Sequence, residues 1–250
     1  MEDRPEDGRP EVNPAGSGNS DLPSARRIAD RTAFIVENTR PRPVPLCPEI
    51  TLRVADEAYP LWEKTEEDLD AMGLPPPFWA FAWAGGQALA RHVLDTPDCV
   101  AGKAVLDLGA GSGLVAIAAL KAGAASVTAA DPDPWAGAAI GLNAGLNGVP
   151  VPDLAGDMLD DPDPRFDTIL VGDLFYEAPL AGRVLALLDR AMATGADVRI
   201  GDPGRSYLPT ARLEKLSDHS VPTTRALEDM EIKRTAVWRL VASPCDNATT

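Results

Sequence analysis

Residues 107–113, Asp-Leu-Gly-Ala-Gly-Ser-Gly, constrain the fold of this chain more than any other segment. A short apolar run precedes them, and an apolar stretch with helical character follows at residues 114–122. Glycine at positions 109 and 111 allows a tight turn and a close approach to a ligand, because no Cβ stands in the way. The helix that follows offers free N–H groups and the positive end of its dipole. The segment therefore predicts a strand, a ligand-binding turn and a helix, although a turn with no ligand is the plainer alternative.

The next predicted strand, residues 126–130, ends at a second acidic residue, Asp131. A carboxylate at this place can accept hydrogen bonds from both ribose hydroxyls of an adenosine, a feature that NAD proteins share. The NAD fingerprint requires a small residue where Leu114 stands, and Gly113 comes one place too early for it. The order of Asp107 and three alternating glycines instead resembles motif I of class I S-adenosylmethionine methyltransferases.

Length and composition fit one α/β domain with additional segments, since the chain has 250 residues of which 45% are hydrophobic. The net charge of −15 argues against nucleic acid as a partner, because phosphates attract Lys and Arg. Cys47, Cys99 and Cys245 show neither a disulfide framework nor metal spacing, so we expect no metal. We find no signal peptide, transit peptide or membrane-spanning run and expect a cytoplasmic protein without a membrane partner.

Strands and helices alternate from residue 104 onward, which favours a parallel sheet. We predict an α/β, Rossmann-like fold with a seven-stranded, mostly parallel sheet, helices on both faces and an N-terminal helical extension. The predicted strands are residues 104–108, 126–130, 150–155, 166–172 and 197–200 and a final pair within 220–242; the predicted helices are 114–122, 135–147 and 179–193.

The chain divides by composition into four parts. Residues 1–23 are polar and rich in proline and glycine, and we expect them to be disordered. Residues 24–100 form an N-terminal segment that we expect to pack on the core, residues 101–243 the methyltransferase domain, and residues 244–250 a flexible end. Within the N-terminal segment we predict helices at 25–38, 61–72 and 87–94, an extended proline-rich stretch at 41–48, and a short strand at 50–54.

An aromatic segment at residues 78–83 precedes the third of these helices. Such clusters are most often part of a core. Trp83, however, stands beside Gly85 and Gly86, which would open the helix, and from there it can form a wall of a cofactor pocket.

Further candidate residues follow the predicted strands, at the edge where open α/β sheets bind ligands. Asp157 can meet the adenine edge, or it is a solvated loop residue. Gly172 and Asp173 end the fourth strand, and the Asp173 carboxylate and the Tyr176 phenol can face the sulfonium methyl group; Asp173 as a helix cap is the alternative. The turn at residues 201–205 is equally well a simple turn or part of the site. His92 and His219 have no motif partner, and we do not expect either to be catalytic.

The chain resembles a specific family, the lysine methyltransferases that act on the beta subunit of electron transfer flavoprotein. The matching segments are Pro48-Glu49-Ile50-x-Leu52, Pro77-Phe78-Trp79-Ala80-Phe81-x-Trp83-x-Gly85-Gly86-Gln87, Val105-Leu106-Asp107-Leu108-Gly109-x-Gly111, Asp131-x-Asp133-Pro134, Gly172-Asp173-x-Phe175-Tyr176 and Ile200-Gly201-Asp202-Pro203-Gly204-Arg205. Glu177 and Ala84 depart from the pattern, since Asp and Pro are usual there.

The resemblance implies S-adenosylmethionine as cofactor and the flavoprotein beta subunit as protein substrate. It implies Asp173 and Tyr176 as catalytic residues. The cofactor-binding candidates are Trp83, Asp107, Gly109, Gly111, Asp131, Asp157 and Gly172. Two alternatives stay open: a small-molecule N-methyltransferase of the nicotinamide type, and a non-catalytic protein that binds an adenosine cofactor.

Overall fold

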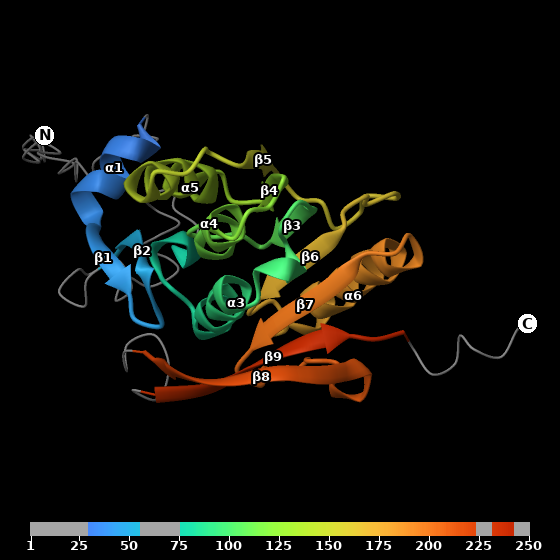
Figure 1. The fold of residues 1–250 in the computed structure, drawn as a ribbon. Helices are drawn as coiled ribbons and strands as arrows, with labels where there is room; N and C mark the ends of the chain where they lie inside the picture. The colour runs from blue at the N-terminus through green and yellow to red at the C-terminus, as the bar shows by residue number, and fades with distance from the viewer. Residues whose placement is uncertain (1–29, 56–75, 224–231, 243–250) are drawn as a thin grey trace, which may run out of the picture.

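The computed structural model describes residues 30–55, 76–223 and 232–242, and these contain a seven-stranded sheet (Figure 1). The strand order is β5-β4-β3-β6-β7-β9-β8. The strands are β3 (Ala104–Leu108), β4 (Ser126–Ala130), β5 (Asp153–Ala155), β6 (Thr168–Gly172), β7 (Asp197–Asp202), β8 (Leu213–Pro222) and β9 (Ile232–Leu240). β9 runs antiparallel to both of its neighbours, and the pairs from β5 to β7 are parallel. The predicted mostly parallel sheet is confirmed.

Helices cover both faces of the sheet, as predicted. They are α3 (Ala84–Asp95), α4 (Leu114–Lys121), α5 (Pro134–Asn147) and α6 (Ala178–Ala193). Side chains alternate along each strand, so Val105 packs in one hydrophobic cluster with α3 and α4, whereas Leu106 and Leu108 pack in another with α6. The glycine turn after β3 is thereby held between two buried layers.

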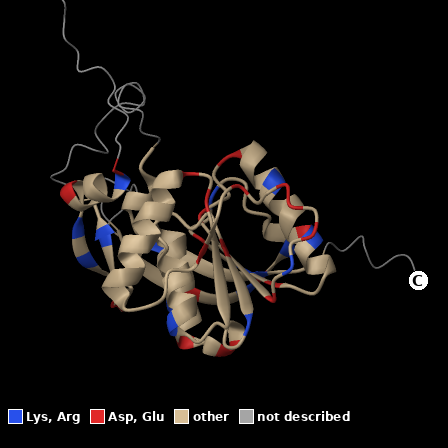
Figure 2. Ribbon diagram, turned by 90° about the horizontal axis from the view of Figure 1, so that it is seen from above, with Lys and Arg blue, Asp and Glu red and all other residues tan. Residues whose placement is uncertain are grey.

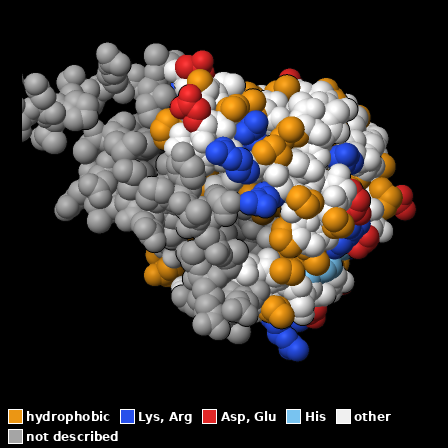
Figure 3. Space-filling view, turned by 90° about the vertical axis from the view of Figure 1, so that its left-hand side faces the viewer, with side chains coloured by type: hydrophobic (Ala, Val, Ile, Leu, Met, Phe, Trp, Pro, Cys, Tyr) orange, Lys and Arg blue, Asp and Glu red, His pale blue; other side chains and the backbone are white. Residues whose placement is uncertain are grey.

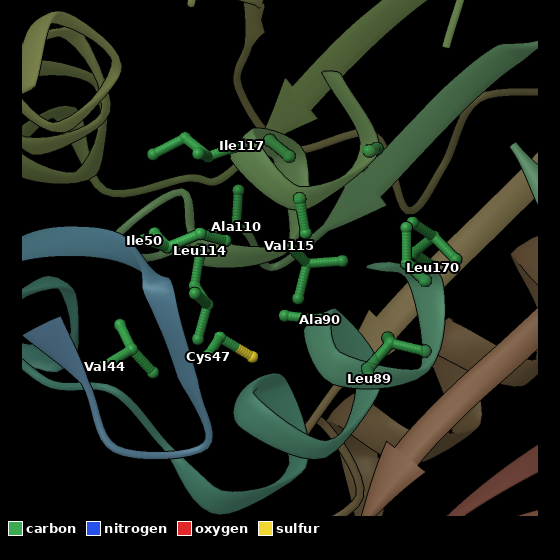
Figure 4. Close-up of a cluster of buried hydrophobic side chains, with 14 of the residues drawn as sticks. Val44, Cys47, Ile50, Leu89, Ala90, Ala110, Leu114, Val115, Ile117 and Leu170 are labelled. Carbon is green, nitrogen blue, oxygen red and sulfur yellow. The ribbon is translucent and has the colours of Figure 1, made fainter. Parts of the chain in front are cut away.

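A short helix and a hairpin precede this core: α1 (Arg31–Asn38), β1 (Arg40–Val44) and β2 (Cys47–Val54). Figure 4 shows the hairpin side chains Val44, Cys47 and Ile50 pointing toward residues of α3 and α4, in a cluster where Ile50 is fully buried. Two asparagines of α5 accept hydrogen bonds from the β2 backbone, at 2.8 Å from Arg53 N to Asn143 Oδ1 and 3.0 Å from Thr51 N to Asn147 Oδ1. The hairpin is therefore fastened to the domain along one edge.

The structure corrects several predicted boundaries. The first strand of the final pair begins at Leu213, not within residues 220–242, because β8 is a largely polar edge strand whose register shifts between Lys215 and Ser217. β2 begins at Cys47, the proline-rich stretch before it forms β1, and α3 begins at Ala84 rather than at residue 87. The predicted turn at residues 201–205 starts inside β7, which runs to Asp202. The predicted helix at 61–72, the tail 1–23 and the end 244–250 lie outside the described residues.

Charge is distributed unevenly over the molecule. Several of the acidic segments coloured in Figure 2 lie on loops between the helices that flank the sheet. Figure 3 shows Lys and Arg side chains on the face that carries α1 and the hairpin, where Arg40 and Arg42 of β1 are exposed. No helix within the described ranges is long and apolar enough to cross a membrane.

Candidate active site

The glycine turn connects β3 to α4 through three residues with left-handed backbone conformation. Gly109, Gly111 and Gly113 have φ of 70°, 49° and 79°, which glycine adopts without a Cβ clash. The N–H groups of Gly109 and Ala110 donate to the carbonyl oxygen of Ala130 at 2.9 and 3.1 Å. The turn is therefore tied to the end of β4 and places the first residues of α4 at the carboxyl edge of the sheet.

Asp107 lies beneath this turn. Its carboxylate accepts a hydrogen bond of 2.9 Å from the Ala116 N–H in the first turn of α4. Burial raises the pKa of Asp107 to about 7. The sequence placed Asp107 among the cofactor-binding residues, and in the structure its contact is with the backbone that carries the glycine turn.

Asp131, at the end of β4, meets the glycine turn directly. One carboxylate oxygen accepts from Gly111 N and the other from Asp133 N, both at 2.9 Å. Each oxygen keeps a lone pair for a further donor. Burial raises the pKa of Asp131. Two of the cofactor-binding candidates, Gly111 and Asp131, are therefore in direct contact.

A cavity of about 690 Å³ opens beside Asp131. Its walls come from α1, the ends of β4 and β5, and the first turns of α5, and the residues that line it are Asp30, Arg31, Thr32, Ala129, Asp131, Pro132, Asp133, Pro134, Gly137, Ala138, Ile140, Leu154, Ala155 and Gly156. The volume is in the range typical of ligand pockets. Of the predicted site residues, Asp131 lines this cavity, whereas the glycine turn, Trp83, Asp173 and Tyr176 do not. The contribution of α1 was not predicted, and no motif in its sequence indicates it.

Asp157 follows β5 but is not part of this lining. One oxygen accepts from Leu159 N at 2.9 Å, and the other pairs with Arg183 Nη2 at 2.9 Å. These contacts lower the pKa of Asp157, the backbone hydrogen bond most. The carboxylate is thus engaged by Arg183, a partner that sequence reasoning did not find.

Asp173 is the point at which three distant segments meet. It has left-handed φ of 57°, and its N–H donates to the Gly201 carbonyl oxygen at 3.1 Å. Oδ2 accepts from Gly86 N at 3.1 Å, and Oδ1 accepts from Arg205 Nη2 at 2.9 Å. Burial raises the pKa of Asp173 to about 6, although Arg205 acts to lower it. The Arg205 contact brings the turn at residues 201–205 into the site.

Glycines allow this convergence, because α3 lies directly on the ends of β6 and β7. A Cβ on Gly85 would overlap the Gly201 carbonyl oxygen, and a Cβ on Gly201 would overlap that of Gly85. A Cβ on Gly172 would lie 3.2 Å from Gly86 Cα. Gly172, predicted to bind cofactor, is thus required at least for the approach of α3.

Aromatic side chains form the exposed border of the site. The Phe78 ring lies 5.9 Å from that of Trp83 and 6.2 Å from that of Tyr176, measured between centroids. Trp83 Nε1 donates to the Phe78 carbonyl oxygen at 3.0 Å. Phe78 and Tyr176 are 43% and 41% exposed. Burial of the hydroxyl raises the pKa of Tyr176, and the negative charges of Glu177 and Asp131 add to the effect.

The two histidines lie in another part of the molecule. His92 Nε2 is 2.7 Å from Arg199 Nη1, and His219 Nε2 is 2.9 Å from Ser217 Oγ. Burial and then Arg199 lower the pKa of His92 to about 4. Neither histidine contacts Asp173 or Asp131 in the described hydrogen bonds, and the described residues hold no cluster of metal-binding side chains.

Comparison with known proteins identifies the chain. Residues 88–171 match the family model described as Ribosomal protein L11 methyltransferase (PrmA). The electron transfer flavoprotein beta subunit lysine methyltransferase of Rattus norvegicus is 40% identical over 213 residues, which are 82% of this chain and 82% of the rat protein. The human protein of the same name is 38% identical, over 82% of this chain and 80% of its own length. The chain belongs to the electron transfer flavoprotein beta subunit lysine methyltransferases.

The family resemblance stated from the motifs is thereby confirmed, and the chain is a methyltransferase. The homologue of Caenorhabditis elegans is 34% identical over 77% of this chain and 83% of its own length. Among solved structures, the ribosomal protein L11 methylase of Lactobacillus delbrueckii subsp. bulgaricus is 24% identical, covers 65% of this chain and 81% of its own, and gives a TM-score of 0.48.

Proposed function

We propose that this methyltransferase transfers methyl groups from S-adenosylmethionine to lysine side chains of the beta subunit of electron transfer flavoprotein. The substrate is the one named for relatives 38–40% identical over about 82% of the chain. The structural observation that supports it is the juxtaposition of a ribose acceptor, Asp131, with a buried carboxylate, Asp173, at one edge of the sheet.

The residues present fit S-adenosylmethionine. The Asp131 carboxylate has acceptor capacity for ribose hydroxyls, and the turn at Gly109 and Gly111 lets the chain approach a ligand. Asp131 and Asp173 supply negative charge near a cationic sulfonium. When bound, the cofactor supplies an electrophilic methyl group. Trp83 and the cavity beside Asp131 complete the surface that would hold it.

The chain's own residues position the acceptor amine. A lysine with a pKa near 10.4 is neutral in only about one molecule in a thousand at pH 7.4, and only the neutral amine has a free lone pair. Removal of the amine from water on binding favours the neutral form, because burial disfavours charge. Asp173 would accept a hydrogen bond from the amine, and Tyr176 would orient it from the exposed side. Fixing this geometry is the main contribution to rate that the protein makes.

The test uses purified enzyme, methyl-labelled cofactor and recombinant flavoprotein. We expect label in the beta subunit, at lysines identified by mass spectrometry. A beta subunit with those lysines changed to arginine is the control and should stay unlabelled. Efficient labelling of nicotinamide or another small amine, with an unlabelled beta subunit, would support a small-molecule enzyme instead. Cofactor binding without transfer to any acceptor would support a non-catalytic binding protein.

A further inference from the structure

The proposed role of Asp173 raises an electrostatic problem. A lone carboxylate beside an amine stabilises the ammonium form, because an opposite charge within about 4–6 Å favours the charged state. The same carboxylate that binds the lysine would therefore hold the proton that must leave. Burial acts in the opposite direction, but it also raises the pKa of Asp173 itself. With an isolated carboxylate here, the enzyme would bind the lysine more tightly, but a smaller fraction of the bound lysine would be the neutral, nucleophilic amine.

Arg205 is placed to solve this problem. Its guanidinium donates to Asp173 Oδ1 at 2.9 Å, and the two side chains are 24% and 9% exposed. The turn that carries it is held by Asp202, whose Oδ1 accepts from the N–H groups of Gly204 and Arg205, both at 2.7 Å. Gly204 has φ of 94°, so the turn depends on a glycine. The position of the guanidinium is thus built into the fold.

The other groups around Asp173 do not replace this charge. From α3, Asp173 receives the Gly86 N–H, and the first turn of that helix carries no acidic residue. From β7, Asp202 raises the pKa of Asp173 as a second negative charge. On its own segment, Tyr176 and Glu177 add no positive charge. Among the described residues, the cation that contacts Asp173 is Arg205.

We propose that Arg205 is a positioning residue that lets Asp173 bind the acceptor amine as a hydrogen-bond acceptor without holding a proton on it. The inference rests on the proposed lysine methylation. The fixed positive charge of Arg205 favours loss of a proton both from the Asp173 carboxyl group and from the bound ammonium group. It therefore raises the fraction of enzyme in which a carboxylate lies beside a neutral amine, the state that can react. No further reactant is needed, because the amine loses its proton to solvent before it accepts the methyl group.

The test is the pH profile of kcat for Arg205→Gln and Arg205→Lys. With glutamine, the rise of kcat should move by about one pH unit or more to higher pH, and kcat near pH 7 should fall about tenfold or more, while KM for the cofactor stays within about twofold. Lysine keeps the charge and should restore most of the wild-type profile. Arg212→Gln, which breaks an Arg–Asp pair with Asp189 where the arginine is 17% exposed, is the matched control and should leave the profile unchanged.

Asp173→Asn gives a second measurement that does not depend on the folding of the Arg205 variants. It leaves Arg205 as an unbalanced positive charge, so the residual single-turnover rate should rise at lower pH than in the wild type. A uniform loss of rate at all pH values in Arg205→Gln, or a shift to lower pH, would overturn the inference. So would an unshifted profile in Asp173→Asn.

These outcomes are separable from a failure of the proposed function. If wild-type enzyme does not methylate the beta subunit, the proposed function is wrong. If it does, and the Arg205→Gln profile coincides with that of the wild type, only the role of Arg205 is wrong.

Discussion

Three carboxylates lie at the carboxyl ends of β3, β4 and β6: Asp107 and Asp173, which are buried, and Asp131, which is partly buried. Desolvation raises the pKa of each. Their partners differ, and so do the consequences. Asp107 binds the backbone of α4, Asp131 binds the glycine turn, and Asp173 binds α3 and Arg205. The first therefore affects stability, whereas the other two are available to ligands.

Asp107→Asn should change how stability depends on pH. An unfolded Asp ionises near pH 4 and the folded Asp107 near pH 7, so the folded state binds more protons between these values and loses stability as pH rises through them. Asparagine keeps an oxygen for the Ala116 N–H and does not ionise. The free energy of unfolding of the variant minus that of the wild type should therefore increase by up to about 1.4 kcal/mol per pH unit from pH 5 to 7, then level off. Urea denaturation at pH 5, 6, 7 and 8 measures this; a constant difference would show that Asp107 does not titrate there.

Asp131→Ala should weaken cofactor binding by about 1–3 kcal/mol, because the ribose hydroxyls lose their acceptor and the Gly111 N–H loses its partner. Isothermal titration calorimetry with S-adenosylmethionine and S-adenosylhomocysteine measures the change. Asp153→Ala, at an exposed aspartate at the start of β5, is the control and should bind like the wild type. Unchanged affinity in Asp131→Ala would remove this residue from the cofactor site.

At the scale of elements, the placement of α3 determines the acceptor end of the site. The helix reaches the strands only because Gly85 and Gly201 bring two backbones into contact, and this puts the Gly86 N–H on Asp173. Neighbouring glycines of one helix therefore have different roles. A Cβ on Gly85 would overlap the Gly201 carbonyl oxygen and the Asp173 carboxylate, whereas one on Gly86 meets only Leu114 Cδ2, at 3.9 Å.

Gly85→Ala should destabilise the protein by about 1–3 kcal/mol, since the Gly201 backbone oxygen cannot rotate away and the Asp173 carboxylate is held by its own hydrogen bonds. Gly86→Ala is the matched control, and its stability should be close to that of the wild type. Chemical denaturation of both variants measures the difference. Equal stabilities would mean that α3 moves away from β7 at little cost.

The sequence predicts the central elements well and the additional ones poorly. β3 and β4 have the predicted bounds because buried parallel strands are short apolar runs that end in glycine or aspartate. β1 contains two prolines, so the sequence predicts only extended chain there. It forms a strand all the same, because prolines are tolerated in a strand at a sheet edge. The site residues after the strands follow from topology, but Gly86 and Arg205 bind Asp173 across 87 and 32 residues. No local pattern encodes contacts of that kind.

At the scale of the whole molecule, charged side chains are distributed unevenly over the surface. The net charge is −15, yet the face that carries α1 and the hairpin displays arginines, and acidic segments lie on loops between the helices (Figures 2 and 3). A protein substrate with a basic loop would therefore be attracted more to some faces than to others.

Salt should weaken the recognition of the flavoprotein more than that of the cofactor. We expect KM for the beta subunit to rise several-fold between about 50 and 300 mM NaCl, because screening reduces attraction between exposed charges. KM for S-adenosylmethionine is the internal control and should change less, since the proposed ribose acceptor Asp131 is only partly exposed. A KM for the flavoprotein that does not depend on salt would show that apolar contacts dominate docking.

The threefold attachment of Asp173 also bears on how such an enzyme can acquire new acceptors. Asp173 itself joins Gly86, Gly201 and Arg205, so a change at this position disturbs three segments at once. Phe78 and Tyr176, by contrast, are more than two-fifths exposed. We therefore expect substitutions of Phe78 to alter acceptor choice with less disturbance of the fold than substitutions around Asp173. Laboratory evolution toward other amines should begin with libraries at Phe78 and leave Tyr176, the glycines and Arg205 unchanged.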